Sequence, residues 1–260
     1  IYALGSNLGV ADPEAVLELI DACEKAGVDI ISMGVVLAWT TEMQQRGKIS
    51  TDETMGLKFS WGDKATYLRA IDLVVQAPNE FYSDLGKGVE YASKKYGGED
   101  FAIRLGGLEI PGYHTGLGNV LGLTVGARHS HLDSAAYSAD QKAFNQPISD
   151  EQIVDYIIDE ENRRNVLNCM ISCLFARNVY TYENVILALK GLGIERTEEE
   201  LKALGKDIFR KKYALKEKFG FRFEDLRIPK RFFETPSTTG IIEEERVKRA
   251  IELYRKKRGV

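Results

Sequence analysis

The sequence predicts a mostly α-helical protein, and three observations carry that prediction. Apolar residues recur at helical spacing along most of the 260 residues, helix-capping residues bracket several of these stretches, and no run of alternating strands is present. Hydrophobic residues make up 44% of the chain and charged residues 28%. This composition allows a sizeable core and rules out global disorder.

Four helices are predicted in the first part of the chain. Asp12 suits the N-cap of the first helix, Pro13 suits its first position and Gly27 suits its C-terminal stop. The other three are expected at about 32–46, at 64–76 and in a stretch that ends at Tyr96.

The middle of the chain has a different composition. From Leu105 to Ala127 glycine is dense and charge is almost absent, so we expect a loop system or closely packed buried backbone there. This change places a domain boundary near its start. We therefore predict one helical domain at 1–108 and a second at 109–260.

Helices resume after Pro147. The stretch 163–176 is expected to be a buried helix because its second half is very apolar, and the basic run Arg210–Lys212 is typical of a solvated face. The remaining helices are predicted at 149–162, at 182–192, after the capping box of Thr197 and Glu200, and at 243–257.

Charge and composition argue against several classes of protein. The net charge of −4 argues against a nucleic-acid-binding protein. The longest uncharged stretch, 110–127, holds five glycines and a proline, so no membrane span is expected. Three cysteines are too few for a disulfide framework and suit a reducing, cytoplasmic location. The chain opens without methionine, and we expect it to be a fragment of a longer protein.

Two histidines lie two residues apart, His129 and His131, between Arg128 and Asp133. On a strand they would share a face, as in a zinc hydrolase, but such a site needs downstream nitrogen ligands and no histidine follows His131. An active-site role for one histidine and a pair of surface loop histidines both remain open.

Two of the cysteines, Cys169 and Cys173, are four residues apart in an apolar stretch, where a helix would place them on one face. They are interpreted either as small buried hydrophobic residues or as ligands of a metal or cluster. A [4Fe–4S] cluster uses four cysteines, so three cannot supply a whole one.

Several segments, taken in order, resemble the C-terminal half of the aldehyde ferredoxin oxidoreductase family, whose members are tungsten or molybdenum enzymes with a bis-pterin cofactor and a [4Fe–4S] cluster. Their order and spacing agree over nearly the whole chain. The segments are Leu4–Gly9, Cys23–Gly34, Trp61–Asp63, Leu105–Tyr113, Cys173–Phe175, Phe219–Phe221, Ile228–Phe232 and Tyr254–Gly259.

The resemblance implies two helical domains that cover the pterins, with the N-terminal pterin-binding β domain outside this chain. It implies oxidation of aldehydes to carboxylic acids, with electrons passed through the cluster to ferredoxin. It also implies a homodimer or an electron-transfer subunit as a further partner, and a fragment that is inactive alone.

The resemblance assigns roles to particular residues. Two pterin-contacting motifs of the family, Asp-x-x-Gly-Leu followed by Asp or Cys, fall on 24–29 and 168–173. The first implies pterin contacts for Glu24, Gly27 and Asp29, with glutamate in place of the leading aspartate. The second implies a pterin contact for Asn168, although Ile171 stands in place of glycine, and it makes Cys173 the fourth cluster ligand.

The family's active-site histidine falls on His131, which implies a general acid/base. The family has a basic, pterin-contacting residue two positions later, where this chain has Asp133, so Arg128 or His129 would take its place. Two other functions stay open: a tungsten-dependent reductase subunit acting on aromatic acyl-CoA thioesters of the benzoyl-CoA type, and a non-catalytic helical interaction module.

Overall fold

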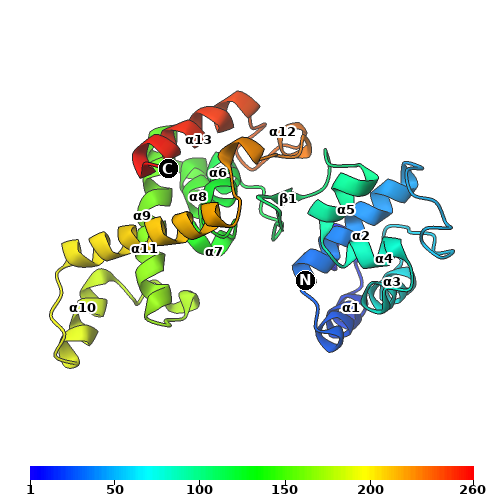
Figure 1. The fold of residues 1–260 in the computed structure, drawn as a ribbon, viewed down its shortest axis with the longest axis horizontal. Helices are drawn as coiled ribbons and strands as arrows, with labels where there is room; N and C mark the ends of the chain where they lie inside the picture. Colours follow the sequence, from blue (N-terminus) through cyan, green and yellow to red (C-terminus); the bar gives the residue numbers. More distant parts are fainter. The chain divides into compact units, whose positions relative to one another are not determined.

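The computed structural model describes all 260 residues, and 61% of them are helical. Thirteen α-helices and two very short strands are present (Figure 1), which confirms the mostly α class. None of the helices is long and apolar enough to cross a membrane.

The chain forms two compact units. Unit 1 contains Ile1–Tyr113 and Arg227–Thr235, and unit 2 contains His114–Leu226 and Pro236–Val260. This division differs from the boundary expected after residue 108 in two places, because residues 109–113 and the later segment 227–235 cluster with unit 1.

Unit 1 is built around α1 and α2. Asp12 caps α1 by accepting a hydrogen bond from the Glu14 amide at 3.3 Å, and Gly27 ends it with a φ of 69°, as predicted. In α12, Arg231 donates two hydrogen bonds of 2.6 Å to the carboxylate of Glu42 on α2, which ties the later segment to this unit. Its elements are η1 (Ser6–Leu8), α1 (Pro13–Ala26), α2 (Ile30–Gln45), α3 (Lys64–Gln76), α4 (Glu80–Leu85), α5 (Val89–Tyr96), β1 (Arg104–Leu105), β2 (Leu108–Glu109) and α12 (Arg231–Glu234).

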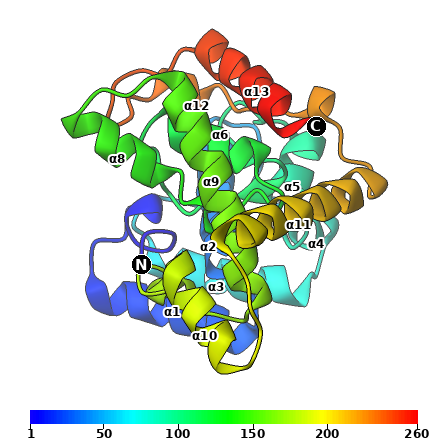
Figure 2. The ribbon, with the colours of Figure 1, turned by 90° about the vertical axis from the view of Figure 1, so that its left-hand side faces the viewer.

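Unit 2 is built around two long helices, α9 and α11, which pack against each other (Figures 1 and 2). A Cβ at Gly205 on α11 would overlap the carbonyl of Asn162 on α9, so a glycine is needed where the helices cross. The elements are α6 (Leu117–Val125), α7 (His131–Ser134), α8 (Tyr137–Asn145), α9 (Asp150–Cys169), η2 (Leu174–Ala176), α10 (Tyr182–Gly191), α11 (Glu198–Lys218), η3 (Phe223–Asp225) and α13 (Glu244–Arg258).

The glycine-rich segment is partly a buried helix. Every residue of α6 is buried. The carboxylate of Asp140 accepts hydrogen bonds from the amides of Gly118 and Asn119 at 2.7 and 2.8 Å, which satisfies the first turn of α6 away from water. In the segment 105–127 the expected closely packed, buried backbone is the helix α6. At the start of the same segment, β1 and β2 pair as a small hairpin.

The expectation of a separate buried helix at 163–176 is wrong. A single helix, α9, runs from Asp150 to Cys169, and the chain then turns back so that Arg163 donates to the carbonyl of Arg177 at 3.0 Å. Ile171 and Phe175 are 95% and 96% exposed. Their apolar side chains gave the segment its buried character in the sequence, but unit 2 offers them no partner.

Candidate functional site

The segment from Glu24 to Asp29 ends one helix and begins the next. The amide of Gly27 donates to the carbonyl of Glu24 at 3.1 Å, and the amide of Val28 donates to the carbonyl five residues back at 3.1 Å. Asp29 has a φ of −66° and a ψ of 126°, and it caps α2 by accepting a hydrogen bond from the Ser32 amide at 2.8 Å. Both carboxylates of the segment are exposed, so they are available to a group outside unit 1.

The segment from Asn168 to Cys173 repeats this backbone pattern. The amide of Ile171 donates to the carbonyl of Asn168 at 3.1 Å, and the amide of Ser172 donates to the carbonyl five residues back at 3.1 Å. Cys173 has a φ of −67° and a ψ of 122° and stands at the N-cap of η2. The two segments are therefore equivalent turns, in which Asp29 and Cys173 hold the same position.

Ile171 occupies the position that Gly27 holds in the first turn. Its φ of 56° is left-handed, like the φ of 69° at Gly27. A β-branched residue pays roughly 1–2 kcal/mol for this conformation. The second turn thus keeps a backbone suited to glycine although isoleucine stands there, and the replacement changes the side chain rather than the shape of the turn.

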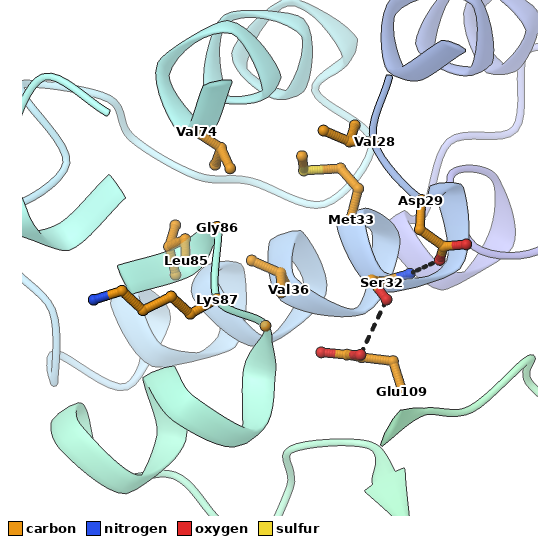
Figure 3. Close-up of a pocket in the computed structure, with 11 residues that line it drawn as sticks. Val28, Asp29, Ser32, Met33, Val36, Val74, Leu85, Gly86, Lys87 and Glu109 are labelled. Carbon is orange, nitrogen blue, oxygen red and sulfur yellow. Dashed lines mark hydrogen bonds between the residues drawn. The ribbon is translucent and has the colours of Figure 1, made fainter. Parts of the chain in front are cut away.

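A hollow of about 370 Å³ lies beside the first turn (Figure 3). Glu109, only 8% exposed, forms part of its wall. Its carboxylate accepts hydrogen bonds from the Ser32 hydroxyl at 3.0 Å and from the Val89 amide at 2.6 Å. Since Ser32 lies on the first turn of α2, Glu109 connects β2 and α5 to the helix start that presents Asp29.

Both cysteines near the second turn are exposed, which corrects the interpretation of Cys169 and Cys173 as small buried residues. They also do not share a helix face, because α9 ends at Cys169 and Cys173 lies beyond the turn. Across the 260 residues, no three His, Cys, Asp or Glu side chains come together as a metal site.

These features fit the groups that the resemblance implies. An exposed thiol is the donor that iron–sulfur clusters use, and here it can provide one ligand to a cluster held elsewhere. Exposed carboxylates at Glu24 and Asp29 suit the amino groups of a pterin, and the exposed amide of Asn168 can both donate and accept. The donor set therefore agrees with contact to an iron–sulfur cluster and a pterin.

His131 is the first residue of α7 and is half-buried. The Ser130 hydroxyl caps this helix by accepting from the Leu132 amide at 3.2 Å. Asp133 is buried, and its carboxylate accepts from the backbone amide of Arg128 at 2.9 Å and from its Nε at 2.8 Å. These contacts fix the loop that leads into His131.

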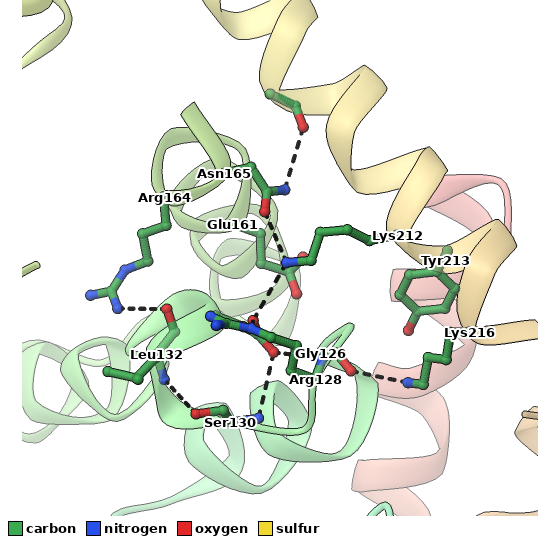
Figure 4. Close-up of polar contacts among 12 residues, drawn as sticks. Gly126, Arg128, Ser130, Leu132, Glu161, Arg164, Asn165, Lys212, Tyr213 and Lys216 are labelled. Atoms are coloured by element: carbon green, nitrogen blue, oxygen red, sulfur yellow. Dashed lines mark hydrogen bonds and ion pairs between the residues drawn. The ribbon is translucent and has the colours of Figure 1, made fainter. Parts of the chain in front are cut away.

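The surroundings of His131 favour a neutral imidazole. Burial lowers its pKa below the ordinary 6.5, the charges of Arg164 and Arg128 lower it further, and Asp133 opposes them. The Arg164 side chain is held beside α7 by a hydrogen bond of 3.1 Å to the carbonyl of Leu132 (Figure 4). At neutral pH the ring therefore carries no charge and can accept a proton.

His129 is buried, so the interpretation of two surface loop histidines is wrong for this residue. Its Nδ1–H donates to the carbonyl of Leu123 at 3.0 Å, and its ring lies 5.7 Å from that of Phe221. Burial, then the charge of Lys216, lowers its pKa to about 4. A buried neutral ring cannot replace a basic contact residue, so His129 does not suit that role.

Acid is expected to destabilise the chain through His129. Its unfolded-state pKa is 6.5 and its folded-state pKa is about 4, so the unfolded chain binds more protons below pH 6.5. Stability is therefore present above pH 6.5 and is lost as the pH falls toward 4, by about 2 kcal/mol between pH 7 and pH 5 from this group. Urea unfolding at both pH values measures the loss.

The matched variant is His129→Asn, because asparagine tolerates the left-handed φ of 55° at this position. It is expected to be less stable at pH 7 but to lose about 2 kcal/mol less than the unchanged chain on going to pH 5. Equal losses in the two proteins would show that His129 does not carry the acid sensitivity.

Two lysines on α11, Lys212 and Lys216, lie near α7, and neither was expected at the candidate site. Lys212 donates to Asn165 Oδ1 at 3.0 Å and lies 3.7 Å from Asp133, and Lys216 donates to the carbonyl of Gly126 at 3.0 Å (Figure 4). Both lysines are half-buried, so the interpretation of the run Arg210–Lys212 as a solvated face is wrong for Lys212. Their four-residue spacing, which puts them on one helix face, was the available signal.

The whole chain, residues 1–260, matches the family model described as "Aldehyde ferredoxin oxidoreductase, domains 2 & 3". The chain belongs to the aldehyde ferredoxin oxidoreductase family. Tungsten-containing aldehyde ferredoxin oxidoreductases of Pyrococcus furiosus and Thermococcus kodakarensis are each 27% identical to it over 100% of this chain and 45% of their own length. The chain thus spans less than half of these relatives.

A third relative covers only part of the chain. The WOR-like subunit of an aliphatic sulfonate oxidoreductase of Pyrococcus furiosus is 30% identical over 50% of this chain and 19% of that subunit. The family is therefore shown over the full chain by the family model.

Proposed function

We propose that this chain is the helical C-terminal portion of a cytoplasmic tungsten enzyme that oxidises aldehydes to carboxylic acids. The reaction is RCHO + H2O → RCOOH + 2 H⁺ + 2 e⁻, and the two electrons leave one at a time through a [4Fe–4S] cluster to ferredoxin. The observation that carries the proposal is the repeated turn, which puts Asp29 and Cys173 in equivalent exposed positions. Similarity to two tungsten-containing aldehyde ferredoxin oxidoreductases over the whole of this chain and 45% of each relative supports it.

Each turn has a separate task in this proposal. Asp29 and Glu24 accept hydrogen bonds from the amino groups of a pterin, and Gly27 supplies the turn that brings them to the surface. Asn168 contacts a pterin through its amide, and the Cys173 thiolate binds one iron of the cluster. The N-terminal domain of the same protein is expected to provide the other three cysteines. Molybdenum in place of tungsten would use the same residues.

His131 serves the substrate. The tungsten–bis-pterin group supplies the two-electron step when it is bound. The neutral imidazole holds a hydrogen bond to the substrate oxygen and exchanges a proton with it as general acid/base. The fixed loop at Asp133 keeps the ring in place between turnovers.

The test uses the complete enzyme. We expect it to contain tungsten and iron, to reduce ferredoxin with a small aldehyde, and to leave benzoyl-CoA unchanged. Elemental analysis and two spectrophotometric assays measure this. Reduction of benzoyl-CoA without aldehyde oxidation would instead identify an acyl-CoA reductase subunit, and absence of tungsten, molybdenum and iron would identify a helical interaction module.

A further inference from the structure

Positive charge exceeds negative charge around α7. The carboxylates within this group belong to Asp133 and Glu160, while Glu161 is taken up by its own ion pair with Arg258 at 2.6 Å. The cationic side chains that meet these two carboxylates, or lie beside them, are Arg128, Arg163, Arg164, Lys212 and Lys216. An anion placed here would therefore be stabilised rather than repelled.

Only part of the Arg128 guanidinium group forms hydrogen bonds within the protein. Its Nε donates to Asp133, but its two terminal amino groups donate to no atom of the chain. The side chain is 46% exposed, while its partner Asp133 is 2% exposed. Asp133 thus holds the guanidinium at Nε from the buried side and leaves its two terminal amino groups available to another acceptor. A planar fork of this kind suits a two-oxygen acceptor.

Lys212 supports the same position from α11. Its ammonium group donates to Asn165 at 3.0 Å and lies 3.7 Å from Asp133, so it shares this carboxylate with Arg128 (Figure 4). Its side chain is 27% exposed. One buried carboxylate therefore faces two cations, both of which reach solvent.

We propose that Arg128 and Lys212 bind an oxyanion group of the substrate beside His131, so that the enzyme prefers short aldehydes with an anionic far end. This inference rests on the proposed function for the reaction itself. His131, three residues from Arg128 and within reach of its charge, would meet the aldehyde end while the cations hold the other. The chemical class is a short aldehyde that carries a carboxylate or another oxyanion.

The experiment compares 4-oxobutanoate with its methyl ester, which keeps the aldehyde and removes the charge. In the complete enzyme, kcat/KM for the anion is expected to exceed that for the ester by about 10- to 100-fold, the range of a charged hydrogen-bond pair. Arg128→Met is expected to bring this ratio to about one, and so is a high salt concentration. A ratio near one in the unchanged enzyme would overturn the proposal.

The matched control is Lys211→Met. Lys211 is the neighbour of Lys212 on α11, but its side chain is 76% exposed and pairs with Asp207 at 2.8 Å. Its loss removes the same formal charge without touching the cluster, so the ratio is expected to stay at the value of the unchanged enzyme. A fall as large as in Arg128→Met would show that only net charge matters and would contradict a specific site.

A binding measurement separates this proposal from the proposed function. Calorimetry with succinate, which has two carboxylates and no aldehyde, is expected to show binding that Arg128→Met abolishes and Lys211→Met keeps. If neither aldehyde is oxidised, the proposed reaction fails while succinate binding still supports or refutes the site. Unchanged substrate ratios together with loss of pterin from Arg128→Met would assign the residue to the cofactor and overturn the proposal.

Discussion

Replacing Cys173 with alanine in the complete enzyme is expected to remove the [4Fe–4S] signal from the visible and electron paramagnetic resonance spectra. The thiol stands exposed at the cap of η2, in the position that Asp29 holds in the equivalent turn. Alanine keeps this cap conformation, because Cys173 makes no side-chain cap hydrogen bond. The loss would therefore report ligation rather than unfolding. Ferredoxin reduction is expected to fall with the cluster.

Cys169→Ala is the matched control for this prediction. Cys169 is also a free, exposed thiol, but it is the last residue of α9 and lies before the turn. Its variant is expected to keep the full iron content and spectrum. The assignment of Cys173 would be wrong if its variant kept the spectrum, or if both variants lost it equally.

Replacing His131 with alanine is expected to lower turnover by about 10²- to 10⁴-fold, the usual contribution of a general acid/base. Tungsten and iron contents are expected to stay unchanged, since the imidazole is assigned to the substrate. Because the pKa of His131 lies below 6.5, kcat/KM of the unchanged enzyme should decline only on the acid side of that value. Steady-state assays from pH 5 to pH 8, with metal analysis of each variant, measure these effects.

Leu132→Ala provides the control on the same short helix. Leu132 is 42% exposed, and the hydrogen bond from Arg164 reaches its backbone carbonyl, which the substitution keeps. Turnover is expected to stay close to that of the unchanged enzyme. Equal losses in the two variants would mean that α7 matters for stability and that His131 has no chemical role.

Capping chemistry made much of the fold predictable. Asp12, Pro13 and Gly27 bound α1 as expected, and the helix predicted at 64–76 is α3 (Lys64–Gln76). The capping box of Thr197 and Glu200 also opens α11. These signals are local, so a single sequence reveals them. The exact ends of helices were harder to predict: α2 begins at Ile30, whereas a start at residue 32 was expected.

The region after α9 could not be predicted in the same way. The apolar second half of the stretch 163–176 indicated a buried helix, because sequence periodicity assumes that apolar side chains are covered by the same unit. Ile171 and Phe175 instead remain exposed on both sides of Cys173. The left-handed Ile171 was equally hidden, since isoleucine is an unfavourable residue for that conformation.

The candidate site was predictable as separate residues but not as an electrostatic arrangement. The resemblance pointed to His131, Asp29 and Cys173, whereas Arg164, the cation that lowers the pKa of His131 most, comes from a distant position in the sequence. Arg164 lies on α9, and Lys212 reaches Asp133 from α11. Such long-range pairings follow from helix packing, which the sequence pattern alone does not fix.

The most direct test of the account is an X-ray anomalous difference map of the complete enzyme, recorded at the iron absorption edge. We predict an iron peak at Fe–S bonding distance from Sγ of Cys173 and none beside Cys169. An iron cluster whose four thiolates all come from other cysteines, with Cys173 left facing solvent, would contradict the account.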